Sequence, residues 1–219
     1  MCRKLVSLVL VLGMVSAAYA EKNLLVNSWE YPPDLEGWTT YNGVATLTTG
    51  ATVGNTDGVY SLQVNTPESW WNEGLMLDLV PMGLVQSFAD NYAISMDITR
   101  YAADWTNYGG WGTDHQLQIL VNPSCFKPGS SLNWWALGNK GAWNPTMGDS
   151  TQTLVWDYTA IKNDLEYGSS IFRIIIQDFY YMYSPGGQWY IDNVKFIVPE
   201  PATMALLGLG SLALLRRKR

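Results

Sequence analysis

Apolar and polar residues alternate with a period of two in eight short runs along the middle of the chain. Successive side chains of a β-strand point to opposite faces, so this alternation is typical of strands with one buried face. The runs cover residues 44–48, 60–64, 75–80, 92–99, 116–121, 154–158, 172–177 and 189–197. Clusters of Gly, Pro, Asn and Asp, which favour turns, separate them. The pattern predicts a chain of short strands joined by turns.

Helical patterning is nearly absent. Only residues 159–167 have a helical spacing of apolar positions, and the segment is brief. Parallel strands need helical crossovers, so a parallel α/β sheet is not expected. No repeat of fixed period occurs, which argues against a propeller or a solenoid. We therefore expect an all-β domain in which two antiparallel sheets pack as a β-sandwich.

The first 20 residues differ in character from the middle of the chain. Basic residues at positions 3 and 4 precede an apolar run at 5–15, and a small-x-small pattern follows at 18–20. These are the three parts of a secretory signal peptide. We expect signal peptidase to cleave after Ala20.

The last 22 residues have a second distinctive pattern. Pro199, Glu200 and Pro201 precede an apolar run at 202–215, and four basic residues end the chain. The run is shorter than the about 20 residues that usually span a bilayer. Basic residues directly after such a run hold the end in the cytoplasm. A plain tail anchor is one interpretation of this segment.

The three parts in this order resemble the PEP-CTERM sorting signal. The resemblance implies that the apolar segment enters the inner membrane transiently, as a hydrophobic sorting helix. It also implies that an exosortase-type membrane protease acts at the Pro-Glu-Pro site. The protein would then reach the cell surface or the extracellular matrix of a Gram-negative bacterium that makes extracellular polysaccharide. The chain is thus expected to consist of a signal peptide (1–20), a folded domain (21–197) and a sorting segment (198–219).

The expected folded domain is strongly acidic. Residues 21–197 hold 7 Lys and Arg against 18 Asp and Glu, which gives a net charge of −11. Such a surface repels phosphate backbones, so nucleic acid is excluded as a partner. Cys125 is the only cysteine in this segment, so no intramolecular disulfide can form there. We expect Cys125 to pack as a small, partly buried hydrophobe, and a reactive thiol is the alternative.

Tryptophan is abundant, and all 11 copies lie within residues 21–197. Trp38, Trp156 and Trp189 are expected in the core. Seven others lie in polar or Gly-rich surroundings that predict loops: Trp70, Trp71, Trp105, Trp111, Trp134, Trp135 and Trp143. A flat aromatic ring can stack on the C–H face of a sugar while neighbouring amides and acids bond its hydroxyls. These seven are therefore candidate carbohydrate contacts.

Motifs at both ends of the domain sharpen the fold prediction. The chain reads Asn-Leu-Leu-Val-Asn-Ser-Trp-Glu at 23–30, Glu-Gly-Trp at 36–38 and Trp-Tyr-Ile-Asp-Asn-Val at 189–194. These resemble the opening and closing motifs of carbohydrate-binding-module-like jelly rolls. The resemblance implies a sandwich of jelly-roll type whose first and last strands pair.

The same resemblance implies one structural calcium ion between Glu30 and Asp192. Calcium takes six to eight oxygen ligands. Backbone carbonyls and Asn27 would therefore complete its shell. The alternative is that Asp192 caps a strand turn and that Glu30 is a solvated loop acid.

No catalytic constellation stands out. His115 is the only histidine, and no Gly-x-Ser-x-Gly elbow accompanies it. One His and one Cys cannot supply the usual ligands of a zinc site. A glycosidase needs two carboxylates across a cleft, and Glu73, Asp78 and Asp97 form no recognisable arrangement.

The sequence thus predicts a non-catalytic, exported protein that binds extracellular polysaccharide. The alternative is a structural surface or biofilm-matrix protein that contacts other proteins through exposed aromatic residues. A carbohydrate-active enzyme is a third interpretation, which would require two acids converging in a cleft.

Overall fold

The computed structural model describes residues 24–41, 43, 45–66, 74–101, 103, 115–132, 135–143, 148–179 and 187–198. Residues Leu25–Ile197 form one compact unit. Within the described ranges, no helix is long and apolar enough to cross a membrane. The predicted signal peptide and sorting helix lie outside these ranges, and the domain boundaries after residues 20 and 197 stay predictions.

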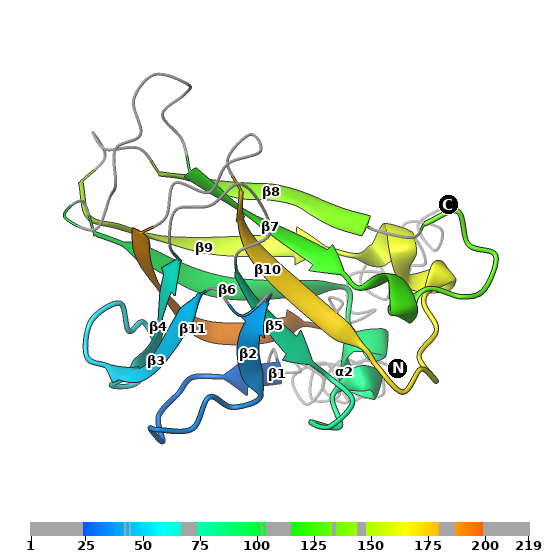
Figure 1. The fold of residues 1–219 in the computed structure, drawn as a ribbon, viewed down its shortest axis with the longest axis horizontal. Coiled ribbons are helices and arrows are strands. Elements are labelled where there is room, and N and C mark those ends of the chain that lie inside the picture. Colours follow the sequence, from blue (N-terminus) through cyan, green and yellow to red (C-terminus); the bar gives the residue numbers. More distant parts are fainter. Residues whose placement is uncertain are drawn as a thin grey trace, which may run out of the picture. The chain divides into compact units, whose positions relative to one another are not determined.

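Two antiparallel sheets form the domain, as the alternation predicts (Figure 1). The first sheet, called sheet A, has the order β3-β4-β11-β6-β9, and β1 also pairs with β11. The second, sheet B, has the order β2-β5-β10-β7-β8. The strands of sheet A are β1 (Leu24–Asn27), β3 (Thr46–Ala51), β4 (Ser61–Thr66), β6 (Ala93–Arg100), β9 (Ser150–Asp157) and β11 (Gly187–Ile197). The strands of sheet B are β2 (Trp38–Tyr41), β5 (Gly74–Asp78), β7 (His115–Val121), β8 (Trp135–Trp143) and β10 (Arg173–Phe179).

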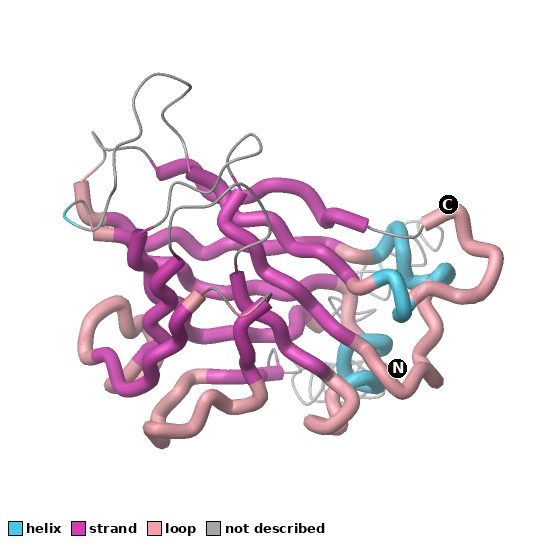
Figure 2. The backbone as a smooth tube through the Cα atoms, in the orientation of Figure 1, coloured by secondary structure: helices cyan, strands magenta, loops and turns pink. Residues whose placement is uncertain are grey.

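Helical segments are short and lie in connections between strands (Figure 2). In the described part of the chain they are the α-helix α2 (Val85–Asp90) and the 3₁₀ segments η2 (Pro123–Cys125) and η3 (Thr159–Asp164). The helical pattern at 159–167 thus corresponds to η3. Phe88 of α2 is buried and stacks on Tyr158, with 4.0 Å between the ring centroids. The Tyr158 hydroxyl donates a 2.9 Å hydrogen bond to the Phe88 carbonyl oxygen, which ties α2 to the segment after β9.

Each of the eight alternating runs coincides with an observed strand. The alternation did not predict three strands, β1, β2 and β8, although the resemblance implies a first strand that pairs with the last. The first two have four residues each, too few for a clear alternation. The third contains Gly138 and Gly141 and has no period-two pattern, so β-propensity gave no signal there.

The core lies between the two sheets and contains the three tryptophans assigned to it. Trp38 is 1% exposed, and Trp156 and Trp189 are fully buried. Trp38 donates from Nε1 to Oδ1 of the buried Asn27 at 2.8 Å, which satisfies its polar atom. Cys125 also packs in this core, as predicted, but it is fully buried, and burial raises the pKa of its thiol. A thiol with a raised pKa is a poor nucleophile.

Candidate functional site

The topology brings several strand ends to one end of the sandwich. In sheet B, Tyr41 pairs with Gly74, which pairs with Gln177. In sheet A, Thr66 pairs with Gly187. Strands β4, β6, β8 and β10 each end here, and the next strand in sequence, which belongs to the other sheet, begins here. We call it the crossover end.

Of the seven candidate tryptophans, two lie within the described residues. Trp70, Trp71, Trp105, Trp111 and Trp134 lie outside the described residues. Two others were expected in loops but belong to β8, of which Trp135 is the first residue and Trp143 the last. Trp143 pairs with His115 at the crossover end, and Trp135 pairs with Val121 at the opposite end of the same strand pair. For Trp135, Trp143 and His115 the backbone alone is described.

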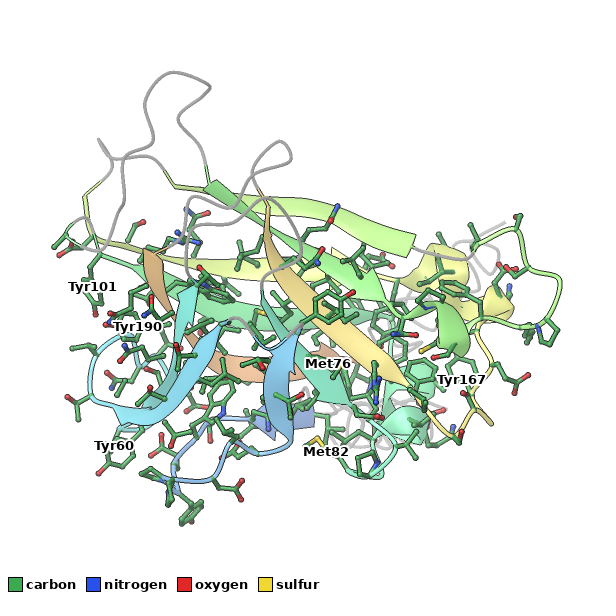
Figure 3. The ribbon with its side chains drawn as sticks, in the orientation of Figure 1. Tyr60, Met76, Met82, Tyr101, Tyr167 and Tyr190 are labelled. Atoms are coloured by element: carbon green, nitrogen blue, oxygen red, sulfur yellow. The ribbon has the colours of Figure 1, made fainter. Side chains whose placement is uncertain are left out.

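The outward face of sheet B carries an apolar row that the sequence analysis did not single out. Met76 of β5 (labelled in Figure 3) pairs with Ile175 of β10, which pairs with Leu120 of β7. Their sequence neighbours, such as Ile174 and Ile176, point into the core. Ile175 is fully buried, although it lies on the outward face, and Met76 and Leu120 are half-buried.

A row with two amides lies beside the apolar row. Gly74, Gln177 and Gln118 are register partners across β5, β10 and β7. Along each strand they lie two residues closer to the crossover end than the apolar row does. Gln177 is 6% exposed and Gln118 is half-buried. At the far end of the face, Arg173 Nε lies 3.1 Å from Asp78 Oδ2, so these two charges pair with each other. The face therefore combines apolar side chains, amides and one compensated ion pair.

The loop between β3 and β4, residues 52–60, lies over part of the outward face of sheet A, at β6 and β11. We call this segment the β3–β4 loop. Thr56 lies over two acids that are register partners, Asp97 of β6 and Asp192 of β11. Farther along, the Gly54 amide donates to the Tyr101 hydroxyl at 2.9 Å. Tyr101 lies against Tyr190, with 5.4 Å between ring centroids in an edge-to-face arrangement (Figure 3).

Of the three candidate acids, the two that the structure describes, Asp78 and Asp97, lie far apart. Asp78 points outward from sheet B and Asp97 outward from sheet A, so they lie on opposite faces of the sandwich. Glu73 lies outside the described residues. Asp97 accepts hydrogen bonds from Thr56, Thr153 and Asn193 beneath the β3–β4 loop.

The two acids expected to hold calcium both bind the main chain of the β3–β4 loop. Glu30 accepts hydrogen bonds from the amides of Val59 and Tyr60, and Asp192 from those of Thr56 and Asp57. Burial raises the pKa of the Asp192 carboxyl, while these amide donors lower it. Among the described residues, no three His, Cys, Asp or Glu side chains form a metal-binding group.

The described donor set does not fit a calcium cage. A cage needs six to eight oxygen atoms facing the ion. The oxygens of Glu30 and Asp192 instead face N–H groups. The Asn27 side chain is also engaged, because it bonds Trp38 and Glu36. Calcium binding stays a prediction. The pairing of the first and last strands, which the resemblance also implies, is present between β1 and β11.

The fold and the C-terminus define an antiparallel two-sheet β-sandwich followed by a sorting signal. Residues 198–219 match the PEP-CTERM protein-sorting motif, which confirms that expectation and indicates export. No curated protein matches the chain in sequence.

Several solved carbohydrate-binding modules are similar in structure. The tandem CBM22 domains of Paenibacillus barcinonensis Xyn10C match at 13% identity and a TM-score of 0.49, over 84% of this chain and 48% of that one. The chain therefore spans about half of that protein. CBM28, specific for non-crystalline cellulose, matches at 18% identity and a TM-score of 0.47, over 81% and 95%. CBM27-1 of Caldicellulosiruptor saccharolyticus, solved with mannohexaose, matches at 9% identity and a TM-score of 0.48, over 81% and 98%. At these TM-scores the likeness carries no argument about a site.

Proposed function

We propose that this protein is an exported cell-surface module that binds an extracellular polysaccharide without catalysis. The observation that carries the proposal is the outward face of sheet B, where the half-buried Met76 and Leu120 flank the buried Ile175 and the half-buried Gln118 lies beside them. A sugar ring has an apolar C–H face and a rim of hydroxyls. Ligand sites for such molecules combine apolar contact area with a few polar groups.

The candidate tryptophans extend this proposal to the crossover end. Trp70, Trp71, Trp105 and Trp111 belong to connections between strands that end there, and Trp143 ends β8 there. The amide row lies between the apolar row and the crossover end, so it is the part of the sheet B face nearest to these connections. We propose that a polysaccharide chain contacts the sheet B face and aromatic rings from these connections. Trp135 begins β8 at its other end, and Trp134 precedes it in sequence. These two tryptophans would contact the polysaccharide only where the bound polysaccharide is long enough to reach that end.

One observation favours the alternative of a protein-binding matrix component. Tyr31 is 83% exposed and Val59 57% exposed, and the carboxylate of Glu30, which precedes Tyr31, accepts a hydrogen bond from the Val59 main-chain amide. An exposed apolar patch of this kind can mark a protein-contact site. It lies on loops beside sheet A, away from the sheet B face, so mutations can separate the two functions.

Polysaccharide binding is expected to weaken when the sheet B face loses its apolar row. The full chain, in a mild detergent, is passed over the host's own extracellular polymer and over insoluble glucan and mannan. The double variant Met76→Ala/Leu120→Ala should bind about tenfold more weakly, because apolar contact area is removed. Trp71→Ala or Trp135→Ala should also weaken retention. Wild-type binding should persist in 1 M salt, since dispersion contacts are not screened.

The matched control is Val53→Ala/Val155→Ala, which removes exposed apolar groups elsewhere and should bind as wild type. We expect a dissociation constant on the order of micromolar to millimolar for one module. Failure to bind any of the polysaccharides, together with specific capture of a surface protein through Tyr31 or Val59, would support the matrix alternative instead.

Processing at both ends is the second expected result. In a host with an exosortase, the surface protein should begin at Glu21 and lack the apolar run at 202–215. Intact-mass measurement of surface-extracted protein reads both ends at once. A variant in which Pro199, Glu200 and Pro201 are all replaced by alanine should keep its tail and stay with the inner membrane. Wild-type surface protein that still ends at Arg219 would contradict the sorting role.

A further inference from the structure

The β3–β4 loop is bound by acids from segments that are far apart in the chain. Glu30 precedes β2, Asp97 lies in β6 and Asp192 in β11. The contact between Thr56 and Asp192 joins residues 136 positions apart. Asp192 is fully buried and Asp97 is 7% exposed. A buried carboxylate is costly unless donors surround it, so the donors that these acids receive decide how the region is stabilised.

The loop supplies these donors from its main chain, two for each of two acids. The amides of Thr56 and Asp57 donate to Asp192 Oδ2 at 2.5 and 2.7 Å. The amides of Val59 and Tyr60 donate to Glu30 Oε1 at 2.9 and 3.2 Å. Main-chain N–H groups gathered in this way form a concave anion site, or nest. Here the anions are side chains of the same protein.

Two glycines make this close approach possible. Gly54 and Gly58 have φ angles of +73° and +84°, a region that favours glycine. A Cβ on Gly58 would lie 2.2 Å from Glu30 Oε1, and a Cβ on Gly54 would lie 2.4 Å from Cβ of Tyr190. The sequence Gly-Asn-Thr-Asp-Gly at 54–58 therefore lets the loop lie directly on the acids and on sheet A.

We propose that the main-chain N–H groups of the β3–β4 loop take the place of a metal ion, so that Glu30 and Asp192 fasten the loop to the sandwich directly. The hydrogens of these N–H groups carry partial positive charge and face the carboxylate oxygens that would otherwise bind a cation. Asp97 adds a third attachment, because it accepts a hydrogen bond from the Thr56 hydroxyl at 2.6 Å, and the side-chain Nδ2 of Asn193 in β11 donates to the same carboxylate at 2.9 Å. These bonds hold the loop over Asp97 and Asp192, at the centre of the outward face of sheet A.

Amide hydrogen exchange tests this proposal residue by residue. The full chain, in a mild detergent, is measured in EDTA and in calcium chloride. The amides of Thr56, Asp57, Val59 and Tyr60 should be protected in EDTA, and calcium should leave their rates unchanged. Glu30→Gln should speed exchange at Val59 and Tyr60 by about tenfold, since a charge-assisted acceptor is lost. Asp192→Asn should have the same effect at Thr56 and Asp57.

The control is Asp90→Asn, which changes an exposed acid in α2 and should leave all four amides unchanged. Glu30 is partly exposed, so its variant keeps the test valid even where Asp192→Asn does not fold. Exchange that is fast in EDTA and slows only when calcium is added would overturn the proposal and support the calcium ion. Equal effects of Glu30→Gln on all four amides, or no effect on any, would overturn it as well.

Discussion

Trp189→Ala should lower the free energy of unfolding by about 3–5 kcal/mol, the usual range for removing a buried aromatic side chain. Trp189 is fully buried in β11, whose neighbours are β4 on one side and β6 on the other. Its register partner in β4 is Val64, also fully buried. Alanine would leave a cavity at the middle of sheet A that these strands cannot close. Urea unfolding monitored by circular dichroism measures the change.

Val155→Ala is the matched control, because Val155 lies in β9 of the same sheet but is 43% exposed. Its effect should stay within about 0.5 kcal/mol, as for most surface substitutions. The substitution Trp189→Phe should lie between the two, since it keeps part of the ring volume. Unfolding midpoints that agree for Trp189→Ala and Val155→Ala would contradict the assignment of Trp189 to the core.

Gly74→Ala should also destabilise the domain, by about 1–3 kcal/mol, the range for forcing extra atoms into a packed region. A Cβ on Gly74 would lie 1.8 Å from the Ile176 carbonyl oxygen and 3.0 Å from Cα of Gln177. Both atoms belong to the main chain of β10, so no side-chain rotation relieves the clash. Strands β5 and β10 would have to separate next to the amide row of the ligand face.

Gly168→Ala provides the comparison for this glycine. A Cβ on Gly168 would meet only the end of the Glu166 side chain, at 3.1 Å, which can move aside. We expect an effect near zero, or a gain of up to about 1 kcal/mol because alanine restricts the unfolded chain. The same urea experiment measures both variants. In the polysaccharide-binding experiment, Gly74→Ala should also be retained more weakly than wild type. Equal midpoints for the two variants would show that β5 and β10 do not approach as described.

Period-two alternation located the strands because a sandwich buries one face of each strand and exposes the other. It failed for β8, whose glycines at 138 and 141 interrupt any pattern. The alternation also did not predict the apolar row of sheet B, because it led us to expect polar residues at outward positions. The signal was present in Ile174–Ile176, three apolar residues in succession, which indicates burial on both faces.

Core tryptophans were predictable where they fell within an alternating run, as Trp156 and Trp189 do. Trp29 was not predicted, yet it is fully buried, with a φ of 54°. The glycines of the β3–β4 loop predicted a turn, but the sequence did not predict which residues this loop contacts. Nothing local in the sequence indicates that Asp192 bonds the main chain 136 residues earlier, because only the folded sheet brings the two together.

The position of β11 has a consequence for the order in which the domain can form. It is the last strand of the domain in sequence, yet it lies between β4 and β6 in the interior of sheet A. Until residues 187–197 have crossed the membrane, the strand pairs β3–β4 and β6–β9 are not joined into one sheet and cannot cover the core. An exported chain with this topology stays unfolded, and so can be threaded, until nearly all of it has crossed the membrane. A chain stalled before residue 187 would present two open strand edges, which are templates for aggregation.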